Sequence, residues 1–195
     1  IQMKENKYDD NIFFQKYSQM SRSQQGLAGA GEWETLRKLL PDFKDKRVLD
    51  LGCGYGWHCI YAMEHGASSV VGVDISHKML EVAKEKTHFP QVEYKCCAIE
   101  DVEFPEESFD VILSSLAFHY VADYEILVKK IYRILKSGGK LVFTVEHPVF
   151  TAYGTQDWHY NEKGEILHFP VDNYYYEGKR TAVFLGEKVT KYHRT

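Results

Sequence analysis

The sequence predicts an α/β fold with a doubly wound parallel sheet, and two observations support this. Between residues 48 and 146, short apolar runs alternate with segments of helical length, as in parallel strands joined by crossover helices. The first run, RVLDLGCGYG from Arg47 to Gly56, ends in glycines at every second position. Such glycines permit a tight turn and let a ligand approach the backbone closely.

The core elements follow in order along the chain. Strands are expected at Val48–Leu51, Val70–Asp74, Val92–Cys96, Phe109–Ser114 and Leu141–Glu146. Helices are expected at Trp57–His65, closed by Gly66, at Ser76–Lys86, capped by Ser76, and at Asp123–Lys136, capped by Asp123 and stopped by Gly138 and Gly139. The five strands would form the sheet, and the three helices would pack on its faces.

The flanking segments differ in character from this core. Residues 1–45 have aromatic residues at helical spacing, and they form either two helices packed on the sheet or a helical lid over the strand ends. Residues 149–195 are rich in Tyr and Gly and predict an irregular extension of β-hairpins. We therefore expect one domain with a lead-in at 1–45, a core at 46–148 and an extension at 149–195.

Composition narrows the possible partners and location. A formal charge of −4, with Lys and Arg scattered singly, argues against nucleic acid as a partner. No apolar run approaches the length that spans a bilayer. The four cysteines lack the spacing of a metal site, so we expect free thiols, no metal and a reducing cytoplasm.

The glycine-rich turn also predicts the class of ligand. Its spacing is G-x-G-x-G, whereas G-x-G-x-x-G suits a pyrophosphate. Asp74 closes the second strand, where its carboxylate can hold a ribose diol, and Asp50 adds an acid near the turn. This excess of negative charge disfavours a pyrophosphate and suits a cationic nucleoside that carries an amino acid.

Four motifs together resemble the class I S-adenosylmethionine-dependent methyltransferases. They are VLDLGCGYG, VVGVDIS, FDVILSSLAFHYV and LKSGGKLVFTVEHP, and the resemblance covers roughly residues 12–148. The best match is the small-molecule, type 11-like branch that includes quinone-biosynthesis enzymes; YSQMSRSQQGLAGAGEW and EHP resemble a bacterial subgroup of it. The resemblance implies a Rossmann-like fold, S-adenosylmethionine as cofactor, S-adenosylhomocysteine as product and a small-molecule methyl acceptor.

The resemblance also implies which residues bind the cofactor. The turn would pass beneath the methionine part, Asp74 would bind the ribose, and Ile75 and Met79 would pack on the adenine, although Met79 could be plain core. The full set is Tyr17, Arg22, Gly52, Cys53, Gly54, Gly56, Asp74, Ile75, Met79, Ile99, Glu100, Ser115 and Leu116. Of these, Ser115 and Leu116 would border the methionine end, and Tyr17 and Arg22 would reach its carboxylate, unless Arg22 is a solvated helix residue. Ala98 departs from the family pattern, which has Asp there, so the adenine amino group would rely on backbone carbonyls, water or Glu100.

His119 is the candidate catalytic base, because it follows the fourth strand on the cofactor side. It could instead cap a short helix or merely line the pocket. His147 is a second candidate, with Pro148 fixing a turn. The aromatic residues Trp158, Tyr160 and Tyr174–Tyr176 could wall an apolar acceptor site or pack as hairpin side chains.

The end of the chain raises a further expectation. Family members complete a seven-stranded sheet, and no closing unit is recognisable after residue 150, so we expect a C-terminally truncated chain with an exposed edge that invites a homodimer. A nicotinamide-dependent oxidoreductase and a non-catalytic S-adenosylmethionine-binding module are the alternative functions. The identity of the acceptor is not encoded in any motif.

Overall fold

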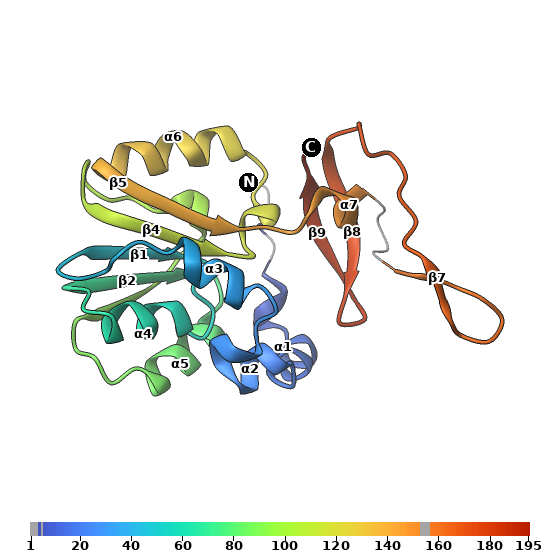
Figure 1. Cartoon of the computed structure of the whole chain (residues 1–195), viewed down its shortest axis with the longest axis horizontal. Coiled ribbons are helices and arrows are strands. Elements are labelled where there is room, and N and C mark those ends of the chain that lie inside the picture. Colours follow the sequence, from blue (N-terminus) through green and yellow to red (C-terminus); the bar gives the residue numbers. More distant parts are fainter. Residues whose placement is uncertain (1–3, 5, 153–156) are drawn as a thin grey trace.

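The computed structural model describes residues 4, 6–152 and 157–195. Its centre is a five-stranded parallel sheet in the order β3-β2-β1-β4-β5 (Figure 1). The strands are β1 Arg47–Leu51, β2 Ser69–Asp74, β3 Val92–Cys96, β4 Phe109–Ser115 and β5 Leu135–Thr144. The strand order reverses between β1 and β4, which confirms the doubly wound sheet.

Helices cover both faces of this sheet (Figure 1). On one face lies α6, Tyr124–Ile134, whose buried residues pack with Leu49, Leu51 and Ile112. On the other face lie α4, Trp57–Glu64, and α5, His77–Lys86, whose buried residues pack with Val48, Val70 and Val111. The alternation of side chains along β1 therefore divides the core into two apolar layers.

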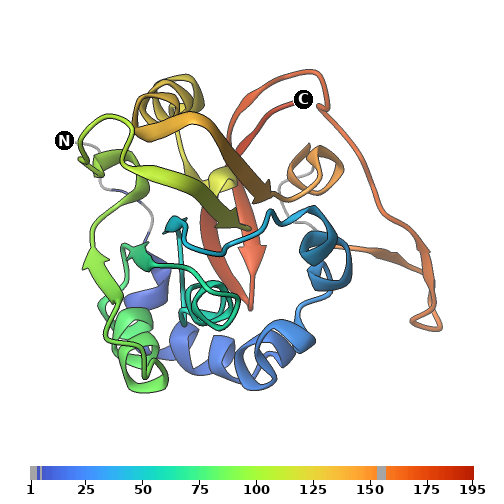
Figure 2. The same cartoon turned by 60° about the vertical axis from the view of Figure 1, so that its left-hand side comes forward.

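The N-terminal segment wraps past the carboxyl ends of the strands rather than lying flat on the sheet (Figure 2). Its elements are η1 Lys7–Asp9, α1 Asn11–Ser18, α2 Ser21–Gln24, η2 Gly26–Gly29 and α3 Trp33–Leu39. Helix α1 begins where the side chain of Asp10 accepts hydrogen bonds from the backbone of Ile12 and Phe13. Phe13, fully buried, packs on Ala182 and Val189 of the C-terminal extension.

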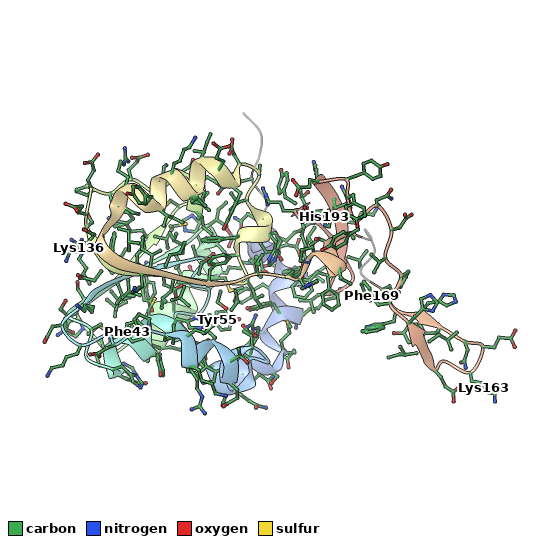
Figure 3. The ribbon with its side chains drawn as sticks, turned by 45° about the horizontal axis from the view of Figure 1, so that its top comes forward. Phe43, Tyr55, Lys136, Lys163, Phe169 and His193 are labelled. Atoms are coloured by element: carbon green, nitrogen blue, oxygen red, sulfur yellow. The ribbon has the colours of Figure 1, made fainter. Side chains whose placement is uncertain are left out.

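The C-terminal extension consists of a short helix and two hairpins, as the sequence predicts in outline. The elements are α7 Pro148–Ala152, β6 His159–Tyr160, β7 Ile166–His168, β8 Gly178–Phe184 and β9 Glu187–His193. The β8–β9 hairpin stands beyond the carboxyl ends of the central strands (Figure 1). The β6–β7 hairpin projects away from the body, with Lys163 at its turn and Phe169 near its base (Figure 3).

Helix α6, strand β5 and the turn at Pro148 differ from the sequence-based prediction. Strand β5 covers Leu135–Thr144, so it begins earlier and ends earlier than the predicted Leu141–Glu146. Helix α6 ends at Ile134, four residues before the glycine that was expected to stop it, because Leu135 already has extended backbone and pairs with Phe109. Gly138, at φ +76°, instead lies inside β5, next to a shift in the β4–β5 register. Pro148 begins helix α7 rather than fixing a simple turn. Among the described residues, no helix is long and apolar enough to cross a membrane.

Candidate active site

A cavity of about 260 Å³ opens at the carboxyl ends of β1, β2 and β4. This is where the strand order reverses, the position at which open α/β sheets bind ligands. Three parts of the chain form its walls. The N-terminal segment contributes residues such as Tyr17, the sheet core contributes residues such as Gly54, and the β8–β9 hairpin contributes Phe184. Segments far apart in the sequence thus enclose one space.

The turn after β1 is bound to the end of β2. The backbone N–H groups of Gly52 and Cys53 both donate to the carbonyl of Val73, over 2.8 and 2.9 Å. Gly52 has φ +80°, and a Cβ there would lie 2.6 Å from that of Ala117. A side chain is therefore excluded at Gly52 by protein packing and by the left-handed backbone.

Gly54 and Gly56 are also left-handed, at φ +52° and +76°, for different reasons. A Cβ on Gly54 would meet no protein atom within 4 Å, and Gly54 lines the cavity. A Cβ on Gly56 would lie 2.2 Å from the hydroxyl of Tyr94. Gly54 therefore leaves bare backbone facing the cavity, whereas Gly56 permits packing at the start of α4.

Asp74 lies at the end of β2 and lines the cavity. Its carboxylate accepts hydrogen bonds from the backbone N–H groups of Gly54 and Ser76, each over 2.9 Å. Burial raises the pKa of Asp74, and these two hydrogen bonds act in the opposite direction. The carboxylate is thus fixed in place with its oxygens beside the bare backbone of the turn.

An apolar wall continues from Asp74 around the cavity. Ile75, Met79 and Ile99 line it, and Met79 is also 98% buried, with 2% of its surface exposed. Met79 therefore belongs to the wall and to the packed interior at once. Ala98 and Glu100 line the same region, so the position that carries Asp in the family pattern offers only a methyl group here.

Arg22 lies in the opposite wall of the cavity and forms an ion pair there, so it is not a solvated helix residue. Its guanidinium pairs with the carboxylate of Glu32, which also accepts a hydrogen bond from the Ser115 hydroxyl over 3.2 Å. Leu116 has φ +52°, an uncommon conformation for a branched side chain, and its N–H donates to the Thr144 carbonyl. Arg22, Ser115 and Leu116 all line the cavity, as does Tyr17.

The end of the cavity nearest the hairpin is lined by His119, Tyr120, Glu146, Phe184 and Tyr8. His119 lies in the short helix η4, Phe118–Tyr120, and only 4% of its surface is exposed. Burial lowers the pKa of His119 to about 4, which is well below the ordinary value near 6.5 that the sequence alone suggests. The imidazole is therefore neutral at pH 7.

Four residues that the sequence analysis placed at or near the ligand do not line the cavity. The side chain of Cys53 is buried in the core beside α4, and Gly56 contacts Tyr94. His147 is exposed, and its Nδ1 accepts a hydrogen bond from the backbone of Val149. Asp50 faces Cys59 in the interior rather than the turn, because strand alternation directs it to the α4 face.

The aromatic residues of the extension do not wall the cavity either. Trp158, Tyr160, Tyr175 and Tyr176 are exposed, and none of them lines it. Tyr174 lies against His193, whose Nε2–H donates to the backbone carbonyl of Tyr174 over 2.6 Å. Only Tyr160 lies in a hairpin strand, and Tyr174–Tyr176 lie in the segment before β8, so these residues form neither an acceptor wall nor packed hairpin side chains.

Several lining residues were not anticipated from the sequence. They are Lys4, Tyr8, Met20, Ala117, Tyr120, Val121, Glu146 and Phe184. Tyr8 lies in η1 and Met20 directly before α2, so the only available signal for them was the predicted lid over the strand ends. Nothing local marked Phe184, because only the folding of the hairpin over the strand ends brings it to the cavity.

The chain matches a family model described as a methyltransferase domain over residues 49–143. A solved structure from Listeria monocytogenes, classed with S-adenosylmethionine-dependent methyltransferases, is 57% identical with a TM-score of 0.80, and the match covers 85% of this chain and 78% of that one. An S-adenosylmethionine-dependent methyltransferase of Mesorhizobium loti is 41% identical with a TM-score of 0.80, and coverage is 87% and 77%.

A curated relative is similar over a shorter region. The ubiquinone biosynthesis O-methyltransferase of Coxiella burnetii is 36% identical over 112 residues, which is 56% of this chain and 47% of that protein. The shared part spans about half of each protein.

Proposed function

This chain belongs to the S-adenosylmethionine-dependent methyltransferases, and we propose that it transfers the methyl group of S-adenosylmethionine to a small molecule. Both would be held in the cavity at the carboxyl ends of β1, β2 and β4. The observation that carries the proposal is the bare backbone of Gly54 beside the fixed carboxylate of Asp74 at one cavity. The matches are to methyltransferases, which argues against the alternative of a nicotinamide-dependent oxidoreductase. The assay below separates an active enzyme from a binding module.

The residues of the cavity fit the cofactor. The space over Gly54 is one that a Cβ would fill, so a ligand can lie against this backbone. Asp74 would accept hydrogen bonds from the ribose hydroxyls, and Ile75, Met79 and Ile99 would pack on the adenine. When bound, the cofactor supplies an already activated methyl group on a sulfonium centre.

The methionine part would lie toward the opposite wall. Gly52 and Gly54 would pass beneath it, and Ser115 and Leu116 would border it. Arg22 and Tyr17 would reach its carboxylate, with the Glu32 side chain holding the Arg22 guanidinium in position. Glu100 and the backbone near Ala98 would face the adenine edge. The protein then supplies mainly alignment and exclusion of water.

The hairpin end of the cavity is the proposed acceptor site. Tyr8, Tyr120 and Phe184 give it aromatic walls, and His119 and Glu146 give it polar groups. A cavity of about 260 Å³ with these walls suits a small molecule rather than a polymer. The quinone-pathway name of the Coxiella burnetii relative supports the same class of acceptor.

His119 is the proposed base that removes a proton from the acceptor. Because burial keeps its imidazole neutral at pH 7, it can accept a proton there. We expect His119→Ala to lower kcat by about 100-fold or more while the cofactor Kd stays within about threefold. His147→Ala, which alters an exposed residue outside the cavity, is the matched control. An unaltered kcat in His119→Ala would rule out the base role.

The function itself is tested by ligand-dependent stability together with transfer of a labelled methyl group. S-adenosylhomocysteine should raise the Tm, and NAD at the same concentration should not, because only a ligand of the folded state stabilises it. Label from S-adenosylmethionine should pass to a component of a metabolite extract. Stabilisation without any transfer would instead indicate a binding module.

Two further proposals concern assembly and location. Strand β5 pairs only with β4 among the described residues, and Phe143 and Val145 at this edge are exposed. Such an edge can pair with a second copy, and light scattering would reveal the dimer. All four cysteines are free, which supports a reducing cytoplasm.

A further inference from the structure

A buried lysine lies behind the acceptor end of the cavity. Lys191 is on β9, and only 1% of its surface is exposed. Its Nζ donates to Oε1 of Glu146 over 2.6 Å and lies 5.9 and 5.5 Å from the ring centroids of Tyr120 and Phe184. Glu146, Tyr120 and Phe184 line the cavity, whereas Lys191 does not. Lys191 thus contacts three residues that line the acceptor end of the cavity.

Packing alone does not account for a lysine at this position. The inward-facing residues of β9 are Val189, Lys191 and His193, and Val189 packs with Phe13 and Ala182 in an apolar cluster. An ammonium group taken out of water is costly, and an apolar residue of similar size would avoid that cost. A lysine at this position can form an ion pair with the carboxylate of Glu146, whereas an apolar residue cannot.

The pair also faces His119. The backbone N–H of Glu146 donates to Nδ1 of His119 over 3.5 Å, a long hydrogen bond that places the imidazole beside the Glu146 backbone. The ring packs on Tyr120 at 4.4 Å between centroids, and the Tyr120 hydroxyl in turn meets that of Tyr8. Tyr120 and the segment that follows β5 therefore both contact this imidazole.

The charges on those elements act in opposite directions. After burial itself, the carboxylate of Glu146 raises the pKa of His119 and the ammonium of Lys191 lowers it. Arg194 shares a second cavity with His119 but is held by the carbonyls of Val121 and Ala122. Lys191 is therefore a cation that offsets Glu146 at this site.

We propose that Lys191 is a positioning residue for methyl transfer: it holds Glu146 at the acceptor end and prevents that carboxylate from drawing a proton onto His119. This inference rests on the proposed role of His119 as the base. It assigns a function to the β8–β9 hairpin, which lies outside the part of the chain that matches the family model.

The direct test is a titration of the His119 ring by NMR, with His119→Ala used to identify its signal. In Lys191→Met the protonation midpoint should rise by about one pH unit or more, because Glu146 is no longer offset. Lys188→Met, an exposed lysine on the same strand, should leave it unchanged. A Lys191→Met midpoint equal to that of the wild type would overturn the proposal.

Activity gives the second readout. The acid limb of the kcat/KM profile should move to higher pH in Lys191→Met. For a rise of about one unit from a midpoint of about 4, activity at pH 5 should be about half of its pH 8 value, against about nine-tenths in the wild type. If the midpoint rises and this limb stays in place, Lys191 does not serve catalysis and the proposal fails. A protein that never transfers a methyl group contradicts the proposed function instead, and the NMR titration still decides the charge relationship.

A second pair of variants covers the case in which Lys191→Met does not fold. Glu146→Gln leaves Lys191 without its carboxylate, whereas the double variant Glu146→Gln, Lys191→Met carries neither charge. The His119 midpoint should be higher in the double variant than in Glu146→Gln. Equal midpoints in the two variants would contradict the proposal.

Discussion

At the residue scale, Gly52, Gly54 and Gly56 share one backbone conformation but not one function. Gly52 is excluded from carrying a side chain by Ala117 and Gly56 by Tyr94, while Gly54 faces open space. The sequence spacing predicts the tight turn because φ above zero favours glycine. It does not predict which glycine faces the ligand, because Ala117 and Tyr94 lie far away in the sequence.

Asp50 is a second residue whose surroundings could not be predicted from the sequence. The sequence places an acid next to the turn, and the structure buries it with Cys59 as a hydrogen-bond donor and with Oδ1 lacking a partner among the described residues. Burial raises the pKa of Asp50 to about 7. A single sequence gives the residue type, but only the alternation along β1 in the folded sheet decides which way the carboxyl points.

Asp50 therefore makes the stability of the protein depend on pH. Its folded-state pKa of about 7 exceeds the unfolded value, so its contribution to the free energy of unfolding is lost as the pH rises toward 7. Because asparagine does not titrate, Asp50→Asn should gain about 2 kcal/mol relative to the wild type between pH 5 and pH 8. Urea unfolding at both pH values measures this. The exposed Asp172→Asn should show no such gain, and an Asp50→Asn difference independent of pH would refute the assignment.

At the scale of elements, the two flanking segments form one structure. Phe13 of α1 packs edge-on against Tyr8 and Phe184, with ring centroids 5.1 and 5.7 Å away. Tyr8 and Phe184 line the cavity, whereas Phe13 lies behind them. The helical spacing of Phe13 predicts a buried face on α1 but not its partner, since the hairpin follows more than 160 residues later.

This packing predicts a paired effect on stability and binding. Phe13→Ala should lower the free energy of unfolding by about 3 kcal/mol, because it empties a fully buried site, and should weaken S-adenosylhomocysteine binding as the cavity wall loosens. Ile12→Ala, at a neighbouring side chain that is 60% exposed, should change stability by less than about 0.5 kcal/mol. Chemical unfolding and calorimetry measure the two effects. Equal losses in both variants would mean that α1 is not held by the hairpin.

At the scale of the whole molecule, the sequence predicts the core better than the cavity. The strands β1 to β4 begin and end within one residue of their predicted bounds, because their apolar runs and turns are local signals. Most cofactor-binding candidates also come together at one cavity, since they follow strand ends that the sheet brings side by side. The acceptor end depends on contacts between the two flanking segments and the core, which no local pattern encodes.

The central claim is that S-adenosylmethionine lies against the bare backbone after β1, and one calorimetric comparison tests it. Gly54→Val and Gly164→Val both place a branched side chain on left-handed backbone, at φ +52° and +79°, where no protein atom lies within 4 Å. Only Gly54 lines the cavity, while Gly164 lies at the turn of the projecting hairpin. S-adenosylhomocysteine should bind Gly164→Val as it binds the wild type and should lose at least about tenfold in affinity for Gly54→Val. Unchanged binding by a folded Gly54→Val would contradict the account.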